Sequence, residues 1–276
     1  MVTRYFLFIP FLCLIFLLQA CSNNDPACSS TTKVSFYITD APKSKDVKFL
    51  HLDVQSVDYS VSGDEKWVNL DIQPKQIELL QFNNGKDSLL SNVNLNEGEK
   101  ISQIRLVLGD NSTITLSDGT TQSIKIPSGQ TSGFKINVQS NVEVTSGYKV
   151  VIDFDAQRSI VAKGNGSYSL KPVIRAYIEA NSSFVEGYLT PDKQQTKVFT
   201  VNSAGDTIST VSDTLNNNYF RLHGLFSGAY KLEVQNLEDG RIATLQEVVN
   251  VVGGTNVSLG SLAIPAYPET APNNEQ

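Results

Sequence analysis

The chain is poor in the residues that most often carry enzyme chemistry. Its 276 residues include two histidines, three cysteines, one tryptophan and one methionine. So few histidines and cysteines leave little material for a transition-metal site or a histidine-based catalytic arrangement. The sequence also lacks the glycine and serine patterns of phosphate loops, dinucleotide sites and hydrolase elbows. These absences favour a binding protein over an enzyme.

Positive charge is also scarce. The sequence has 22 lysines and arginines against 28 aspartates and glutamates, which gives a formal net charge of −6. Because the basic residues are scattered among acidic ones, they form no patch for a phosphate backbone. We therefore expect no nucleic-acid partner and no binding to anionic lipid surfaces through charge.

A long apolar run occurs only at the start of the chain. It extends from Tyr5 to Leu18 and ends in Leu18-Gln19-Ala20-Cys21, which resembles the lipobox of bacterial lipoproteins. A membrane span is the alternative, but the run contains Pro10 and is shorter than the roughly 20 residues that a span needs. The sequence therefore predicts a signal peptide over residues 1–20 and lipidation, including palmitate, at Cys21. The resulting protein would be lipid-anchored in a Gram-negative cell envelope, at the outer membrane, facing the periplasm or the surface.

The cysteines offer no internal disulfide in such a protein. Cys13 leaves with the signal peptide and Cys21 takes the lipid, so Cys28 stands alone. It lies in the polar segment 21–32, which we expect to be a flexible tether. Cys28 is then either an idle thiol or one half of an intermolecular disulfide.

From Lys33 onward, short stretches of alternating apolar and polar residues predict strands with one buried face, as at Val34, Phe36 and Ile38. No long amphipathic helix interrupts them. Many short strands without helices predict an all-β chain of two consecutive antiparallel β-sandwich domains. A polar break at Ala180–Ser183 separates residues 33–180 from residues 183–265, and residues 266–276 have the composition of a disordered tail.

A series of motifs spans the first unit in order: Thr39-Asp40-Ala41-Pro42, Trp67, Gln103-Ile104-Arg105-Leu106, Ser132-Gly133-Phe134-Lys135-Ile136, Asp153-Phe154-Asp155-Ala156 and Leu170-Lys171-Pro172-Val173-Ile174-Arg175. On these motifs the unit resembles a family of unknown function, number 4382, which occurs in bacterial envelope lipoproteins. The resemblance implies an architecture and a location but no activity.

The second unit contains a hairpin pattern of apolar residues and glycines, made by Phe220, Leu222, Gly224, Leu225, Gly228, Tyr230, Leu232 and Val234. On this pattern the unit resembles a carboxypeptidase-regulatory or prealbumin-like β-sandwich. The same sandwich is similar to starch-binding modules, so the resemblance implies carbohydrate as a ligand class.

Three carboxylates form a candidate metal site. Asp153 and Asp155 are two residues apart, so on a strand both side chains project to the same face. Asp40 could join them around Ca²⁺, which prefers several hard oxygens. The alternative pairs the carboxylates with arginine, the available partners being Arg105, Arg158 and Arg175.

Four aromatic residues are candidates for ligand binding, because sugars present apolar CH faces that stack on rings. Trp67 follows a polar turn, and Tyr188, Tyr219 and Phe226 flank predicted core positions of the second unit. Core packing is the alternative for each. His223 lies inside the predicted hairpin, and we expect it to be structural.

We therefore expect a non-catalytic, lipid-anchored binding or adhesion module, with polysaccharide as the leading ligand class and no required cofactor. The alternative is a structural subunit that docks other envelope proteins through an exposed sheet edge.

Overall fold

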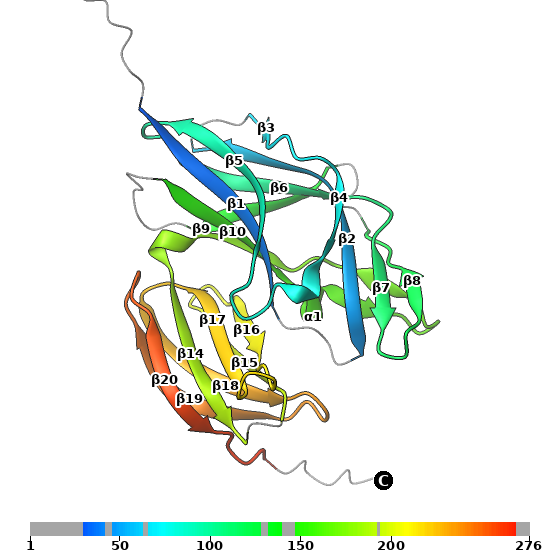
Figure 1. Cartoon of the computed structure of the whole chain (residues 1–276), viewed down its shortest axis with the longest axis vertical. Coiled ribbons are helices and arrows are strands. Elements are labelled where there is room, and N and C mark those ends of the chain that lie inside the picture. The colour runs from blue at the N-terminus through cyan, green and yellow to red at the C-terminus, as the bar shows by residue number, and fades with distance from the viewer. Residues whose placement is uncertain are drawn as a thin grey trace, which may run out of the picture. The chain divides into compact units, whose positions relative to one another are not determined.

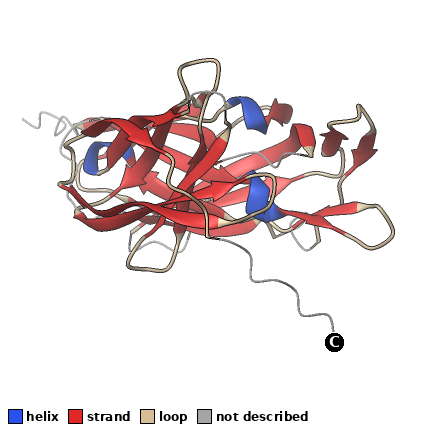
Figure 2. Ribbon diagram, turned by 90° about the horizontal axis from the view of Figure 1, so that it is seen from below, coloured by secondary structure: helices blue, strands red, loops and turns tan. Residues whose placement is uncertain are grey.

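The computed structural model describes residues 30–41, 46–62, 66–127, 132–139, 147–191 and 194–268. Within these ranges strands dominate, as Figure 2 shows. The helical segments are one short α-helix and two 3-10 turns. The all-β prediction is confirmed. The predicted signal peptide, Cys21 and Cys28 lie outside the described residues. No helix in the described ranges has the length and apolar character needed to cross a membrane.

Two lobes can be distinguished by their hydrophobic cores. The N-terminal lobe contains β1(Thr31–Ala41), β2(Val47–Val61), β3(Val68–Asn69), β4(Lys75–Glu78), η1(Leu79–Gln81), β5(Ser88–Asn96), β6(Ile101–Leu108), β7(Thr113–Leu116), β8(Thr121–Ser123), β9(Phe134–Gln139), β10(Tyr148–Asp155), α1(Ala156–Ser159), β11(Ile160–Ala162), β12(Tyr168–Leu170) and β13(Ile174–Ile178). The 3-10 turn η2(Glu179–Asn181) follows. The C-terminal lobe contains β14(Ser183–Thr190), β15(Thr196–Val201), β16(Thr207–Val211), β17(Tyr219–Leu225), β18(Gly228–Asn236), β19(Ile242–Val251) and β20(Val257–Ala263).

The N-terminal lobe consists of one long sheet, whose two halves enclose a common core, and a separate two-stranded sheet, β11-β12. The strand order of the long sheet is β5-β1-β10-β13-β9-β6-β2-β7-β8, and β3 and β4 also pair with β2 (Figure 1). Residues from both halves belong to the same buried cluster, and the ring of Phe36 in β1 lies 5.7 Å from that of Tyr59 in β2. Val34, Phe36 and Ile38 are fully buried, as their alternation predicts.

The C-terminal lobe packs a three-stranded sheet, β17-β14-β20, against a four-stranded sheet, β16-β15-β18-β19 (Figure 1). Its core is a second cluster that includes Val185, Leu189, Phe220 and Leu222. Gly187 is required here, because a Cβ at this position would lie 2.9 Å from the carbonyl oxygen of Gly260 and 3.0 Å from the ring of Phe220.

The sheets are mixed, whereas the sequence predicts antiparallel sheets. Three strand pairs are parallel: β1 with β10, β9 with β13, and β14 with β20. Alternation shows which face of a strand is buried but carries no information on strand direction. Parallel neighbours need a long crossover, and each of these pairs is joined through other strands of the chain.

The structure also shifts two predicted boundaries, the end of the N-terminal tether and the start of the C-terminal tail. Thr31 and Thr32 belong to β1 and pair with Asn96 and Leu95, so the predicted tether ends earlier than residue 32. Tyr267 packs against the C-terminal core, so the predicted disordered tail does not begin at residue 266. Both predictions relied on the polar composition of the two terminal segments. Composition does not reveal the strand pairing of Thr31 and Thr32 or the packing of Tyr267, which fix these residues in the fold.

Candidate functional site

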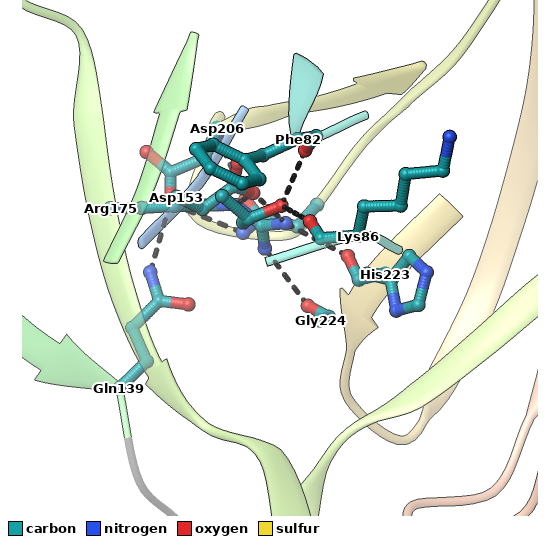
Figure 3. Close-up of polar contacts among 10 residues, drawn as sticks. Phe82, Lys86, Gln139, Asp153, Arg175, Asp206, His223 and Gly224 are labelled. Atoms are coloured by element: carbon teal, nitrogen blue, oxygen red, sulfur yellow. Dashed lines mark hydrogen bonds and ion pairs between the residues drawn. The ribbon is translucent and has the colours of Figure 1, made fainter. Parts of the chain in front are cut away.

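The junction of the two lobes is built around one ion pair. Asp153 in β10 lies directly opposite Arg175 in β13, and Arg175 Nε donates to Asp153 Oδ2 at 2.8 Å. The same guanidinium donates to the carbonyl oxygens of Gly224 at 2.9 Å and of His223 at 2.8 Å (Figure 3). Since both side chains of the pair are only 11 % exposed, Arg175 joins a buried carboxylate of one lobe to the β17 backbone of the other.

The other two predicted metal ligands lie near this pair but are held by the backbone. Asp40 Oδ1 accepts from the Ala156 amide at 3.1 Å, and Asp155 Oδ1 accepts from the Arg158 amide at 2.9 Å, which caps α1. The Oδ2 atoms of both are buried without a hydrogen-bond partner. Burial raises the pKa of Asp40 well above its usual range, and nearby Asp153 raises it further.

These contacts favour the arginine alternative for Asp153, because Arg175 neutralises it. Asp153 and Asp155 do line the same cavity, as their spacing predicts, but its volume is about 80 Å³ and Arg158 and Arg175 line it too. Nowhere in the described ranges do three or more His, Cys, Asp or Glu side chains gather in a way that would hold a metal ion. The junction therefore has the chemistry of a compensated structural contact with room for a few water molecules.

A second contact between the lobes covers two sheet edges. Asn84, in the loop after η1, donates to the carbonyl oxygen of Val211 at 3.0 Å and accepts from the Thr210 hydroxyl at 2.7 Å and the Arg221 amide at 3.2 Å. Val211 ends β16 and Arg221 lies in β17. One amide side chain thus bridges edge strands of both sheets of the C-terminal lobe.

Two tyrosines, one exposed and one half-buried, lie together on the outer face of the three-stranded sheet. Tyr188 in β14 lies opposite Tyr219 in β17, with ring centroids 5.4 Å apart and ring planes at 54°. Tyr188 is 41 % exposed. The Tyr219 hydroxyl donates to Glu186 Oε2 at 2.5 Å, and burial together with this bond raises the pKa of Tyr219. The two rings form a fixed, angled aromatic surface, which we call the tyrosine face.

Along β14 and β17, the tyrosine face continues into a charged and then an aromatic pair. Arg221 Nε lies 3.1 Å from Glu186 Oε2, and the Arg221 guanidinium stands 3.5 Å above the centre of the Phe184 ring. Beyond it, the His223 ring lies 5.7 Å from Phe184. These contacts lock each side chain against its neighbour.

An open hollow lies at the Tyr188 end of this face. Its volume is about 510 Å³, and it is lined by Tyr188, Leu189, Thr190, Pro191, Asn217 and Ser261. Hydroxyl and amide groups therefore stand beside an exposed ring, which is the combination that sugar recognition uses.

The structure separates the four predicted aromatic candidates. Tyr188 and Tyr219 are together, but Phe226 follows the far end of β17, about 23 Å from Tyr219 at the usual strand rise. Trp67 belongs to the other lobe, where the Arg105 guanidinium lies 4.8 Å from its ring centre and is itself paired with Asp58. The predicted patch of Tyr188, Tyr219 and Phe226 is thus wrong for Phe226, because a seven-residue strand separates the ends of its sequence motif.

Sequence reasoning missed Phe184, Glu186 and Arg221 as members of this face. The signal for the first two was present, since residues 184, 186 and 188 alternate with the buried Val185 and Leu189 on one strand. Arg221 follows from the same alternation on β17, once the register with β14 is known.

Comparison with solved structures gives only distant likenesses. The Bacillus anthracis TIE protein is 9% identical with a TM-score of 0.24, over 85% of this chain and 34% of its own, so the chain spans about a third of its length. BcpA, the major pilin subunit of Bacillus cereus, is 12% identical with a TM-score of 0.19, over 85% of this chain and 70% of its own. The shaft pilin SpaA of Lactobacillus rhamnosus GG is 10% identical with a TM-score of 0.20, over 87% of this chain and 100% of its own. At these TM-scores the likenesses carry no argument about function.

No curated protein matches the chain. A protein family does match it: the family described as a domain of unknown function (DUF4382) matches residues 31–172. The matched residues cover the N-terminal lobe up to Pro172, and they include the motifs at Thr39, Asp40 and Asp153-Phe154-Asp155-Ala156. Because the match covers just over half of the chain, this protein belongs to the DUF4382 family.

Proposed function

We propose that the protein is a non-catalytic binding module for carbohydrate, and that the tyrosine face is its ligand site. The observation that carries the proposal is the exposed Tyr188 ring, which is fixed against Tyr219 at the rim of an open hollow with polar lining. A sugar ring would stack on the aromatic surface, and its hydroxyl groups would bond to Asn217, Thr190 and Ser261.

We further propose that the module is lipid-anchored at the cell envelope through Cys21, as its amino-terminal motif predicts. Attachment would make the protein a tethered receptor for a polymer outside the cytoplasm. Several weak contacts from neighbouring anchored copies would then add up on one polysaccharide chain.

Docking of another envelope protein at a sheet edge is the alternative. Among the described strands, none pairs with the outer edge of β19 or of β20. Both strands, however, contain register shifts, between Glu186 and Tyr188 for the β14–β20 pair and on both sides of Leu232 for the β18–β19 pair. Such irregularities blunt an edge against strand addition, so the sugar proposal is better supported.

The test is a screen of the chain carrying Cys21→Ser against plant, host and bacterial glycans. We expect saturable binding that Tyr188→Ala weakens about three- to tenfold, the range that corresponds to one aromatic contact. Tyr219→Ala should have a similar effect, while Trp67→Ala and Phe226→Ala serve as matched aromatic controls and leave binding unchanged. Loss of binding in Trp67→Ala alone would place the site on the other lobe, and no binding by folded protein would reject the proposal.

A further inference from the structure

The tyrosine face continues toward a second hollow. This hollow has a volume of about 340 Å³ and lies beside Phe184, at the opposite end of β14 from Tyr188. Phe184, Arg221 and His223 line it from the strand face, and Ala180, Ser182 and Asn256 line it from η2 and the loop before β20. Gly85 and Tyr177 of the N-terminal lobe and the carboxylate residue Glu179 also line it, so this hollow lies where the strand face meets the other lobe.

The two hollows are in line along one strand. Phe184 and Tyr188 are four residues apart in β14, which corresponds to about 13 Å at the usual strand rise. Their side chains alternate with buried residues and so lie on the same outer face. This spacing is longer than one sugar ring and suits successive units of a chain.

The surface between the hollows carries both a donor and an acceptor but no net charge. Glu186 and Arg221 lie between the aromatic ends, and their side chains are 27 % and 29 % exposed. Because the two charges compensate each other, an anionic polymer gains nothing there, whereas hydroxyl groups can bond to either side chain.

We propose that the Phe184 hollow is a second subsite, which takes a further unit of a neutral oligosaccharide already bound at the tyrosine face. This inference rests on the proposed function and makes it more specific: the ligand is a neutral chain that runs along β14, and a single terminal sugar fills only part of the site.

The test measures affinity against chain length by calorimetry, with neutral glucan, mannan and xylan oligosaccharides of two to six units. For the wild-type chain we expect the affinity for the binding series to rise about tenfold or more between the shortest and longest members. Phe184→Leu should remove this rise and leave the affinity for the shortest binding member unchanged. Phe226→Leu is the matched control, because it makes the same change in a ring outside this face.

A second variant guards against a folding effect of Phe184→Leu. Ala180 is exposed at the edge of the hollow, so Ala180→Trp fills the hollow from the solvent side without disturbing the core. It should also remove the dependence on length. Affinity that is independent of length in the wild type, or an equal loss for short and long chains in both variants, overturns the second subsite but leaves the tyrosine face intact. Absence of binding by every series overturns both.

Discussion

His223 is one of only two histidines in the chain, and the structure gives it a structural role. Burial, together with the nearby positive charges of Arg221, Arg175 and Lys149, lowers the pKa of His223 to about 3. Its Nε2 lies so close to Gly85 that a Cβ there would be 2.2 Å away. The imidazole is thus kept neutral and packed between the lobes.

This burial predicts a specific pH dependence. The unfolded histidine titrates near pH 6.5 and the folded one near pH 3, so unfolding takes up about one proton between these values. Stability should fall as the pH drops through this window, by up to about 1.4 kcal/mol per pH unit from this group. His223→Gln should flatten the profile between pH 6.5 and 3, as measured by urea unfolding. Identical slopes for wild type and variant would contradict the assignment.

The contribution of Asp40 to stability changes with pH in the opposite direction to that of His223. The folded pKa of Asp40 lies above the unfolded value of about 3.9, so ionisation above that pH destabilises the fold. Asp40→Asn keeps an acceptor for the Ala156 amide and removes the charge, so it should be more stable than the wild type at pH 7. The advantage should shrink as the pH approaches 4. Asp40→Ala is the control: it loses the acceptor and should be less stable than Asp40→Asn by about 1–3 kcal/mol.

A thermal melt can test the candidate calcium site of Asp40, Asp153 and Asp155 against the alternative that arginine pairs with the carboxylates. Because Arg175 already neutralises Asp153, we expect the same melting temperature with calcium and with a chelator. A calcium-dependent rise that Asp155→Asn removes would restore the metal site.

At the level of elements, the β10–β13 pair holds the lobes through Arg175. Arg175→Met would leave Asp153 buried without its partner and release two carbonyl groups of β17. We expect a loss of about 3–5 kcal/mol in the free energy of unfolding. The control is Arg241→Met, whose pair with Asp239 is more than a third exposed on both sides, so its loss should lower the stability far less. Equal losses in the two variants would show that Arg175 does not carry the junction.

The same elements show what the sequence could predict. Alternation identified the faces of β1 and β10 correctly: Phe36 and Phe154 are fully buried, while Asp153 and Asp155 line one cavity on the other side. Strand direction was not predictable, because parallel and antiparallel strands share the same alternation. Neither was the bridge made by Asn84, whose partners lie 126 to 137 residues away along the chain.

For the whole molecule, the lipid anchor gives a prediction independent of the sugar site. If Cys21 is the new amino terminus, the cellular protein should carry its acyl mass on an amino-terminal peptide that begins at Cys21. Cys21→Ser should move the protein from the membrane to the soluble fraction. Mass spectrometry that finds an intact segment before Cys21, or an unmodified cysteine there, would contradict the assignment.

The central claim for the whole molecule is that a saccharide binds on the outer face of β14 and β17. The most direct measurement is an NMR titration of chain labelled at its tyrosine rings, with the best-binding oligosaccharide from the glycan screen. We predict that the ring signals of Tyr188 and Tyr219 shift with saturation, while those of Tyr59 and Tyr148, which are buried and line neither hollow, do not. Saturable binding that leaves both the Tyr188 and Tyr219 signals unchanged would contradict the claim.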